Sequence, residues 1–197
     1  MNYKIPIVDM SGCIIEYGDR WESHRVRGDS NNLLLGRRHM GITIAILDKR
    51  MNILIQNRKH SIFDKVWSLS GDTHPRMYEN GRYETLTEAS QRCAMEDLGV
   101  EIDKWMDILT VTYSAIDPRN LEFCENEFLH ILLARFDGPF YPNKNNVYEL
   151  RWIDLDDIMA ATASDLRKEP IKRKFAPWVH KVFSLPEEAI RKAFLQD

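Results

Sequence analysis

The alternation of apolar and polar positions predicts a series of β-strands from residue 41 onward. Residues 41–58 contain two β-rich runs on either side of Asp48-Lys49-Arg50, which predicts a hairpin. A short strand is expected near residues 66–69, and longer strands over residues 108–116, 127–136 and 149–155. Because residues 127–136 are almost entirely apolar, we expect that strand to be central and buried on both faces.

The strongest helix pattern covers residues 84–98 and ends at Gly99, which adopts the positive φ of a helix end without a steric penalty. Shorter helices are expected near residues 156–161, 175–183 and 186–195, the last opening with Pro186 and two glutamates. Residues 25–32 and 139–146 are polar and are predicted to be loops. This order of elements predicts an α/β (α+β) fold with a mixed β-sheet sandwiched between helices.

Length and composition narrow the class of protein. The 197 residues are expected to form a single domain over 1–197, and the net charge of −3 gives no general attraction to nucleic acid. No apolar run reaches the roughly 18 residues of a membrane span, and the first residues lack the apolar core of a secretory signal. Three cysteines lie far apart without a CxxC pair, which predicts reduced thiols in a cytoplasmic protein.

Residues 71–101 gather carboxylates and an imidazole in one turn and one helix. The turn presents Asp72 and His74, and the acidic positions of the helix follow a spacing of four. Such groups bind hard and borderline cations, so the segment suits metal-assisted chemistry on a phosphorylated substrate. The same spacing also describes a solvated face with i,i+4 ion pairs, and the helix alone does not decide between the two. Its charged residues are Glu84, Glu88, Arg92, Glu96 and Asp97.

Histidines and paired glutamates provide further candidate ligands. His24, His39 and His74 each lie beside a predicted strand and near polar loop residues, whereas His60 and His180 have polar contexts that predict exposure. Glu125 and Glu127 stand two residues apart at a strand start, so both point to one face. Three imidazoles and two carboxylates could hold Mn²⁺, Mg²⁺ or Zn²⁺, although one sequence does not show that they converge.

Several motifs occur in an order that resembles a known family. They are Thr-His-Pro at 73–75, Glu-Asp-Leu-Gly-Val at 96–100, Glu-Asn-Glu at 125–127 and Arg-Trp-Ile-Asp-Leu at 151–155. Asp-Arg-Trp at 19–21, followed by His24 and an insertion over residues 25–38, extends the likeness toward the N-terminus. From about residue 7 to residue 183 the chain resembles the type I isopentenyl-diphosphate isomerases of the Nudix superfamily.

This resemblance implies a Nudix fold and a role for individual residues. It implies a metal site of His24, His39, His74, Glu125 and Glu127, and Mg²⁺ held against the substrate diphosphate with the help of Asp97. Tyr113 would assist Glu127, and the ring of Trp152 would face a carbocation. Arg20 and Arg58 match positions that bind diphosphate.

Two departures from the family bear on the chemistry. Asp72 stands where the family carries its catalytic cysteine, and a buried carboxyl can also donate a proton if its pKa is raised. A carboxylate takes the proton back less readily than a thiolate, which favours protonation of an alkene over the full reversible exchange. Cys93 replaces a basic residue, and a two-residue deletion shifts another within residues 59–65, where Lys59 or His60 could substitute.

The predicted function is therefore a metal-dependent isomerase that protonates and deprotonates the carbon skeleton of a prenyl diphosphate, with Mg²⁺ and a second divalent metal. A small-molecule prenyl diphosphate is the expected partner, without nucleic acid. Proton-initiated cyclisation or rearrangement of a larger prenyl diphosphate, Nudix-type hydrolysis, and a binding module without catalysis remain as alternatives. Cys93 argues against hydrolysis, because hydrolases usually carry a glutamate there.

Overall fold

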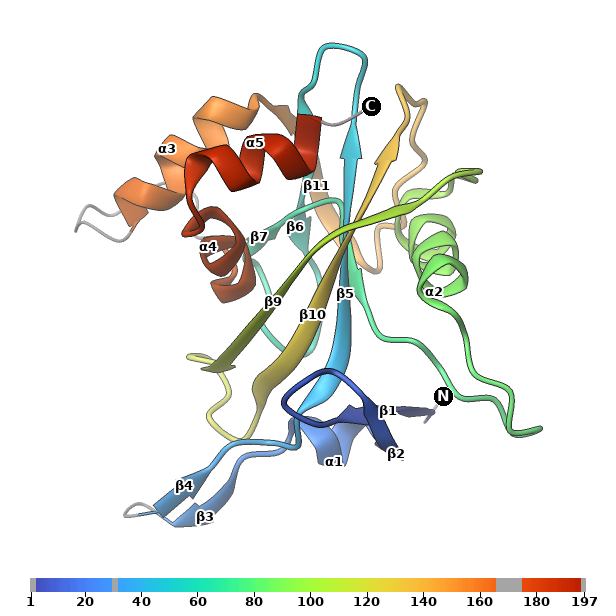
Figure 1. The fold of residues 1–197 in the computed structure, drawn as a ribbon, viewed down its shortest axis with the longest axis vertical. Helices are drawn as coiled ribbons and strands as arrows, with labels where there is room; N and C mark the ends of the chain where they lie inside the picture. Colours follow the sequence, from blue (N-terminus) through green and yellow to red (C-terminus); the bar gives the residue numbers. More distant parts are fainter. Residues whose placement is uncertain (1–2, 30–31, 166–174, 196–197) are drawn as a thin grey trace.

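A nine-stranded mixed β-sheet dominates the computed structural model, which describes residues 3–29, 32–165 and 175–195. Its centre is the parallel pair of β5 (His39–Leu47) and β10 (Cys124–Arg135), as Figure 1 shows. β9 (Met106–Ile116) pairs antiparallel with the other edge of β10. β6 (Ile53–Arg58) forms the predicted hairpin with β5 and pairs antiparallel with β11 (Val147–Ile153) and the short β7 (Trp67–Ser68).

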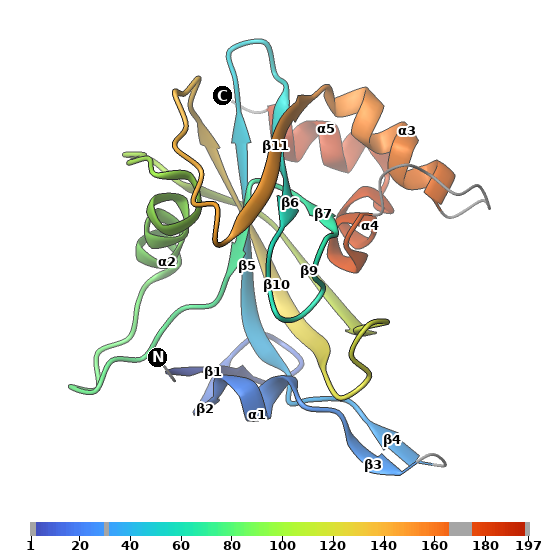
Figure 2. The same cartoon turned by 180° about the vertical axis from the view of Figure 1, so that it is seen from behind.

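Helices cover both faces of the sheet (Figures 1 and 2). One face carries α2 (Leu86–Cys93), which packs on Ile42, Ile44 and Ile46 of β5. The opposite face carries α3 (Leu155–Asp165), α4 (Pro177–Phe183) and α5 (Glu187–Leu195), and Ala45 and Leu47 of β5 point into that second core. The buried central strand thus supplies two hydrophobic cores from alternate residues. This is the predicted fold, a mixed sheet between helices.

Smaller strands complete the site's surroundings. β8 (Gly71–Thr73) pairs antiparallel with β5, and β1 (Lys4–Val8) connects β5 to β2 (Ile14–Asp19). A five-residue helix, α1 (Arg20–His24), follows β2 and is capped by Asp19, whose carboxylate accepts the backbone N–H of Glu22. β1, β2 and α1 were not predicted, because none shows a clear hydrophobic period.

Among the differences between prediction and structure, two concern residues 25–34 and the start of the acidic helix. Residues 25–32 were predicted as a loop, but β3 (Arg27–Asp29) and β4 (Asn32–Leu34) form a separate two-stranded hairpin. The helix predicted from residue 84 begins at Leu86, because Thr85 and Glu88 form a capping box. Its last five residues form a π-helical turn, Ala94–Leu98, which ends at Gly99 with φ of 66° as predicted.

Residues 139–146 are an irregular loop, as predicted, and the loop is fastened to the π-helical turn. The backbone N–H of Tyr141 donates to the carbonyl of Leu98, and that of Asn143 donates to the carbonyl of Asp97. No helix in the described part of the chain is long and apolar enough to cross a membrane.

Candidate metal centre and active site

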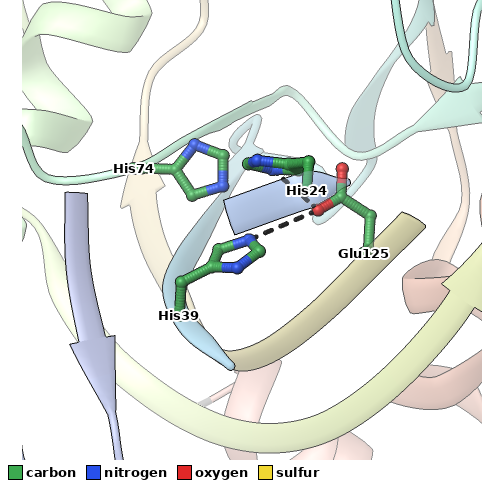
Figure 3. Close-up of side chains that lie close together, drawn as sticks. All are labelled: His24, His39, His74 and Glu125. Atoms are coloured by element: carbon green, nitrogen blue, oxygen red, sulfur yellow. Dashed lines mark ion pairs between the residues drawn. The ribbon is translucent and has the colours of Figure 1, made fainter. Parts of the chain in front are cut away.

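Four elements converge on a buried cluster of histidines and glutamates. The parallel register places His39 on β5 directly beside Glu127 on β10, and Glu125 lies two residues earlier on the same face. His24 ends α1 and His74 follows β8. Ligand atoms of His24, His39, His74 and Glu125 all lie within 4.8 Å of one another. Figure 3 shows these four side chains gathered in one place.

The glutamates sit between the three rings. Oε2 of Glu125 lies 3.1 Å from Nε2 of His24 and 3.5 Å from Nε2 of His39. Oε1 of Glu127 lies 3.1 Å from Nε2 of His74 and 3.6 Å from Nε2 of His39. The structure thus brings the five predicted ligands together, although they are far apart in the sequence.

Backbone carbonyls orient two of the imidazoles. Nδ1 of His24 donates to the carbonyl of Arg20 at 2.6 Å, and Nδ1 of His39 donates to the carbonyl of Arg37 at 2.8 Å. Each ring therefore turns Nε2 toward the glutamates. Histidine ligands of metals are commonly held in this way, with the second nitrogen donating to a carbonyl or a carboxylate.

The pKa values of the clustered residues are shifted by burial and by the charged groups beside them. Burial lowers the pKa of His39, but the facing carboxylates of Glu125 and Glu127 outweigh it and raise this pKa to about 9. Burial, together with the neighbouring imidazoles, lowers the pKa of His74 to about 4. Burial would raise the pKa of Glu125, but the facing His24 and His39 hold it well below its usual value.

These residues fit a divalent metal ion. Nε2 of His39 and Oε2 of Glu125 are buried and make no hydrogen bond. Imidazole nitrogens and carboxylate oxygens are the donors that Zn²⁺, Mn²⁺ and related ions accept. Gly41 keeps the space for this arrangement, because a Cβ there would lie 2.4 Å from Oε1 of Glu127.

A cavity of about 220 Å³ opens beside the cluster and is lined largely by polar side chains. The predicted site residues that line it are Arg20, His24, Arg58, Asp72, His74, Asp97, Tyr113, Glu125 and Glu127.

Asp72 lies in this wall with its two oxygens in different surroundings. Oδ1 accepts from the hydroxyls of Thr43 at 2.7 Å and Ser68 at 2.9 Å. Oδ2 makes no hydrogen bond and lies 3.4 Å from Nη1 of Arg58. Burial raises the pKa of Asp72, against the opposing charge of Arg58.

Tyr113 and Glu127 are joined across neighbouring strands. Their residues pair directly in the β9–β10 register, and the phenol donates to Oε2 of Glu127 at 2.5 Å. Burial and the charge of Glu127 raise the pKa of Tyr113 well above its usual value, so the phenol keeps its proton. Burial would raise the pKa of Glu127, yet the facing imidazoles of His39 and His74 lower it overall.

Asp97 approaches the cavity from the π-helical turn. Asn146 donates to its Oδ1 at 2.9 Å, and the thiol of Cys93 lies 3.8 Å from its Oδ2. Burial raises the pKa of Asp97 to about 6. The carboxylate lines the cavity without joining the cluster of Figure 3.

The predicted tryptophan does not lie at this cavity. Trp152 on β11 is 38% exposed and packs against Phe140, and it is absent from the described residues that line the cavity. Trp178 of α4 lines the cavity instead, is 2% exposed, and donates from Nε1 to Ser68 at 2.9 Å. Sequence reasoning missed Trp178 because only tertiary packing places the predicted helix over this wall.

Two of the charged residues predicted along the acidic helix, Glu84 and Arg92, form a structural ion pair. Glu84 is buried just before the helix and accepts from Nε of Arg92 at 2.7 Å and from the hydroxyl of Tyr78 at 2.7 Å. Nη2 of Arg92 also donates to the carbonyl of His74 at 3.0 Å. The Glu84–Arg92 pair therefore braces the turn that carries His74, while Glu88 and Glu96 lie nearer solvent.

His60 was predicted to be exposed, but it is half-buried and lines the cavity. Its Nε2 lies 2.8 Å from Nη2 of Arg20. The polar composition of its loop gave no signal of this position.

The mixed sheet between helices, with a braced acidic helix beside the cavity, defines a Nudix protein. Residues 37–179 match the NUDIX domain family, and the chain belongs to it. The described fold is similar to that of DR0079 from Deinococcus radiodurans, with a TM-score of 0.61, 17% identity, and coverage of 92% of this chain and 97% of that one. It is also similar to a MutT NUDIX hydrolase from Burkholderia pseudomallei, with a TM-score of 0.54, 17% identity, and coverage of 75% and 97%.

Within this class, the chain is a distant relative of the type I isopentenyl-diphosphate isomerases, which are enzymes. It is 30% identical over 138 residues to isopentenyl-diphosphate Delta-isomerase 1 of Aromatoleum aromaticum, covering 68% of this chain and 71% of that protein. It is 27% identical over 167 residues to the isopentenyl-diphosphate Delta-isomerase of Corynebacterium glutamicum strain R, covering 79% and 81%. The isopentenyl-diphosphate Delta-isomerase I of Clarkia breweri is 22% identical over 185 residues, covering 87% of this chain and 62% of that protein.

Proposed function

We propose that the protein is a metal-dependent isomerase that moves the double bond of a small prenyl diphosphate. The observation that carries the proposal is a pair of carboxyls, the half-buried Asp72 and the buried Glu127, which line one cavity and whose pKa values are shifted in opposite directions. Such a pair supplies a proton donor and a proton acceptor in the same site. The relationship to isopentenyl-diphosphate isomerases supports this reading.

In the proposed reaction, Asp72 gives its proton to one carbon of the alkene. Glu127 removes a proton from another carbon, and its hydrogen bond from Tyr113 holds the accepting carboxylate in place. One proton enters and one leaves, so the product is an isomer of the substrate. General acid and base catalysis of this kind contributes about 10²–10⁴-fold to the rate.

In this proposal, two arginines and Mg²⁺ bind the diphosphate of the substrate, and a second divalent ion binds the His/Glu cluster. Arg20 and Arg58 would bind the diphosphate, because guanidinium groups form strong charge-assisted bonds with phosphates. Asp97 would help to hold Mg²⁺ against the diphosphate, and the cluster of His24, His39, His74, Glu125 and Glu127 would hold a second divalent ion. A metal bound there supplies positive charge that keeps Glu127 ionised.

We assign the aromatic wall of the cavity to Trp178 rather than to Trp152. An indole stabilises a nearby cation by about 0.5–2 kcal/mol, more when water is excluded. Ser68 links this ring to Asp72, since it accepts from Trp178 and donates to the carboxyl.

One alternative reaction would also begin with a proton from Asp72. Because a carboxylate recovers a proton less readily than a thiolate, Asp72 could start a cyclisation or rearrangement instead of a reversible exchange. The volume of about 220 Å³ favours a small substrate over the long chain that such a reaction needs. Hydrolysis is disfavoured because Cys93 is buried and its pKa is raised well above the usual value, so the thiol remains a poor metal ligand.

Turnover in D₂O tests the proposal. Metal-loaded protein incubated with isopentenyl, dimethylallyl and geranyl diphosphates should place deuterium on carbon of a five-carbon product, detected by NMR and mass spectrometry. Asp72→Asn preserves size but removes the transferable proton, and its rate should fall roughly 100-fold or more. Asp107→Asn, which changes a carboxylate that does not line the cavity, is the matched control.

Two results would contradict the proposal. Release of phosphate or diphosphate from an undeuterated product would indicate hydrolysis. Near-normal turnover by Asp72→Asn, with only its melting temperature altered, would make Asp72 a structural residue.

A further inference from the structure

His60 lies in the cavity wall, and no step above uses it. It belongs to the loop after β6, and its backbone N–H donates to Oδ1 of Asp64 at 3.3 Å. The neighbouring Lys59 also lines the cavity, but it is exposed and its Nζ donates to the carbonyl of Lys144 at 2.9 Å. Of the two candidates for the displaced basic position, His60 is therefore the one whose side chain reaches the predicted head-group arginines.

The hydrogen bond to Arg20 decides the protonation state of this ring. A guanidinium has only donors, so Nε2 of His60 must accept from Nη2 of Arg20 across the 2.8 Å that separates them. The ring proton then resides on Nδ1, which lies 3.3 Å from both the carbonyl oxygen and the backbone nitrogen of Ile62. Burial and the charges of Arg58 and Arg20 lower the pKa of His60 to about 3, which agrees with a neutral ring. His60 therefore does not replace the missing cation.

Arg20 is held on several sides. Its guanidinium carbon lies 4.9 Å from the centre of the Trp21 ring and 5.4 Å from that of the Tyr3 ring. His60 accepts from Nη2, while the buried Nε makes no hydrogen bond. A cation that is stacked and bonded in this way loses little conformational entropy when it binds an anion.

Arg20 differs from Arg58 and Arg76, the other arginines of the cavity, because each of those two faces a carboxylate. Arg58 lies 3.4 Å from Oδ2 of Asp72, and Nη1 of Arg76 donates to Glu96 at 2.9 Å. Arg20 forms no ion pair with a described carboxylate within 4.0 Å, so its charge is available to a ligand.

We infer that His60 is a positioning residue that holds the guanidinium of Arg20, as a neutral acceptor, in the orientation that binds the substrate's diphosphate. The inference rests on the proposed function for the identity of the anion. It adds a residue that acts through Arg20 and takes no part in the proton transfers.

Binding of inorganic pyrophosphate in the presence of Mg²⁺, measured by calorimetry on the full metal-loaded chain, tests the inference. His60→Ala should weaken binding about tenfold, because an ordered charge-assisted contact is lost. His60→Gln should recover most of the affinity, since its amide oxygen can accept from Arg20. The control is His130→Ala, because His130 pairs with Asp107 and does not line the cavity.

A double-mutant cycle separates positioning from general structure. Arg20→Ala should weaken binding on its own, and adding His60→Ala to it should cause no further loss. Circular dichroism checks folding, and His60→Leu, which fills the space without an acceptor, takes the place of an alanine variant that fails to fold.

The outcomes distinguish the inference from the function on which it rests. Unchanged affinity in His60→Ala, or full additive loss in the double variant, would overturn the role of His60. A wild-type protein that does not bind pyrophosphate with Mg²⁺ would overturn the diphosphate substrate itself.

Discussion

Gly41 leaves the space in which the carboxylate of Glu127 lies. A Cβ added at this position of β5 would come within 2.4–2.7 Å of the carboxylate atoms of Glu127. Gly41→Ala should therefore displace a metal ligand, weakening metal binding about tenfold or more and costing about 1–3 kcal/mol of stability. Elemental analysis of the purified variant and denaturant unfolding measure the two effects.

A compensating change makes this prediction specific. Glu127→Asp removes one methylene, so the double variant should regain part of the stability lost by Gly41→Ala. Full metal content in Gly41→Ala, at unchanged affinity, would show that Glu127 is not a ligand.

At this scale, the five predicted ligands could be named because the resemblance matches them to family positions, although only His39, Glu125 and Glu127 lie on strands. The tryptophan that lines the cavity, Trp178, could not be predicted, because the direction of its side chain depends on tertiary packing. Trp152 belongs to a recognisable motif but packs against Phe140 and does not line the cavity. His60 looked exposed because its loop is polar, and only the contact with Arg20 brings it into the wall.

Among the elements, the π-helical turn is the one that brings Asp97 to the cavity. It carries Asp97, and it ends at Gly99, where φ is 66° and an added Cβ would lie 2.8 Å from the carbonyl oxygen of Tyr141. Single π-turns often occur at functional sites. Here the turn places an acidic side chain at the cavity while its end packs tightly on the loop of residues 139–146.

Gly99→Ala should cost stability through both backbone strain and a close contact of the new Cβ, whereas Gly81→Ala should cost it through backbone strain alone. Both glycines have positive φ, but an added Cβ at Gly81 has nothing within 4 Å. We expect a loss of about 1 kcal/mol for Gly81→Ala and about 2–3 kcal/mol for Gly99→Ala in denaturant unfolding. Gly99→Ala should also weaken Mg²⁺-dependent binding of pyrophosphate. Equal losses of stability would mean that the contact with Tyr141 has no cost.

Strong periodicity made most elements predictable. The hairpin of β5 and β6, the long β9 and β10, and the C-terminal helices follow apolar patterns that local sequence records. The hairpin of β3 and β4 does not, because its strands of three residues lie outside the main sheet. The π-turn could not be predicted either, since residues 94–98 continue the helical pattern and differ only in hydrogen bonding.

At the scale of the whole molecule, the buried cluster links stability to pH when no metal is bound. The pKa of His39 is raised to about 9 from 6.5, so its stabilising effect is complete below pH 6.5 and is lost as pH rises through 9. We expect the metal-free protein to lose up to about 3 kcal/mol of unfolding free energy over this window.

Metal should reverse this trend. A bound ion takes the place of the proton on His39, so metal affinity should increase as pH rises toward 9. Unfolding of chelator-treated and metal-loaded protein at pH 6.5, 8 and 9 compares the two states. Parallel pH profiles would contradict the assignment of His39 as a ligand.

The parallel pairing of β5 with β10 also bears on how the chain selects its correct fold. The two strands are separated in sequence by β6, β7, β8, α2 and β9, so their alignment is not set by any local turn. A slip of one residue would send Glu125 and Glu127 to the face covered by α2. Only the correct alignment brings the ligands of Figure 3 together. A metal ion that binds them would therefore stabilise this register of the central sheet over any shifted register.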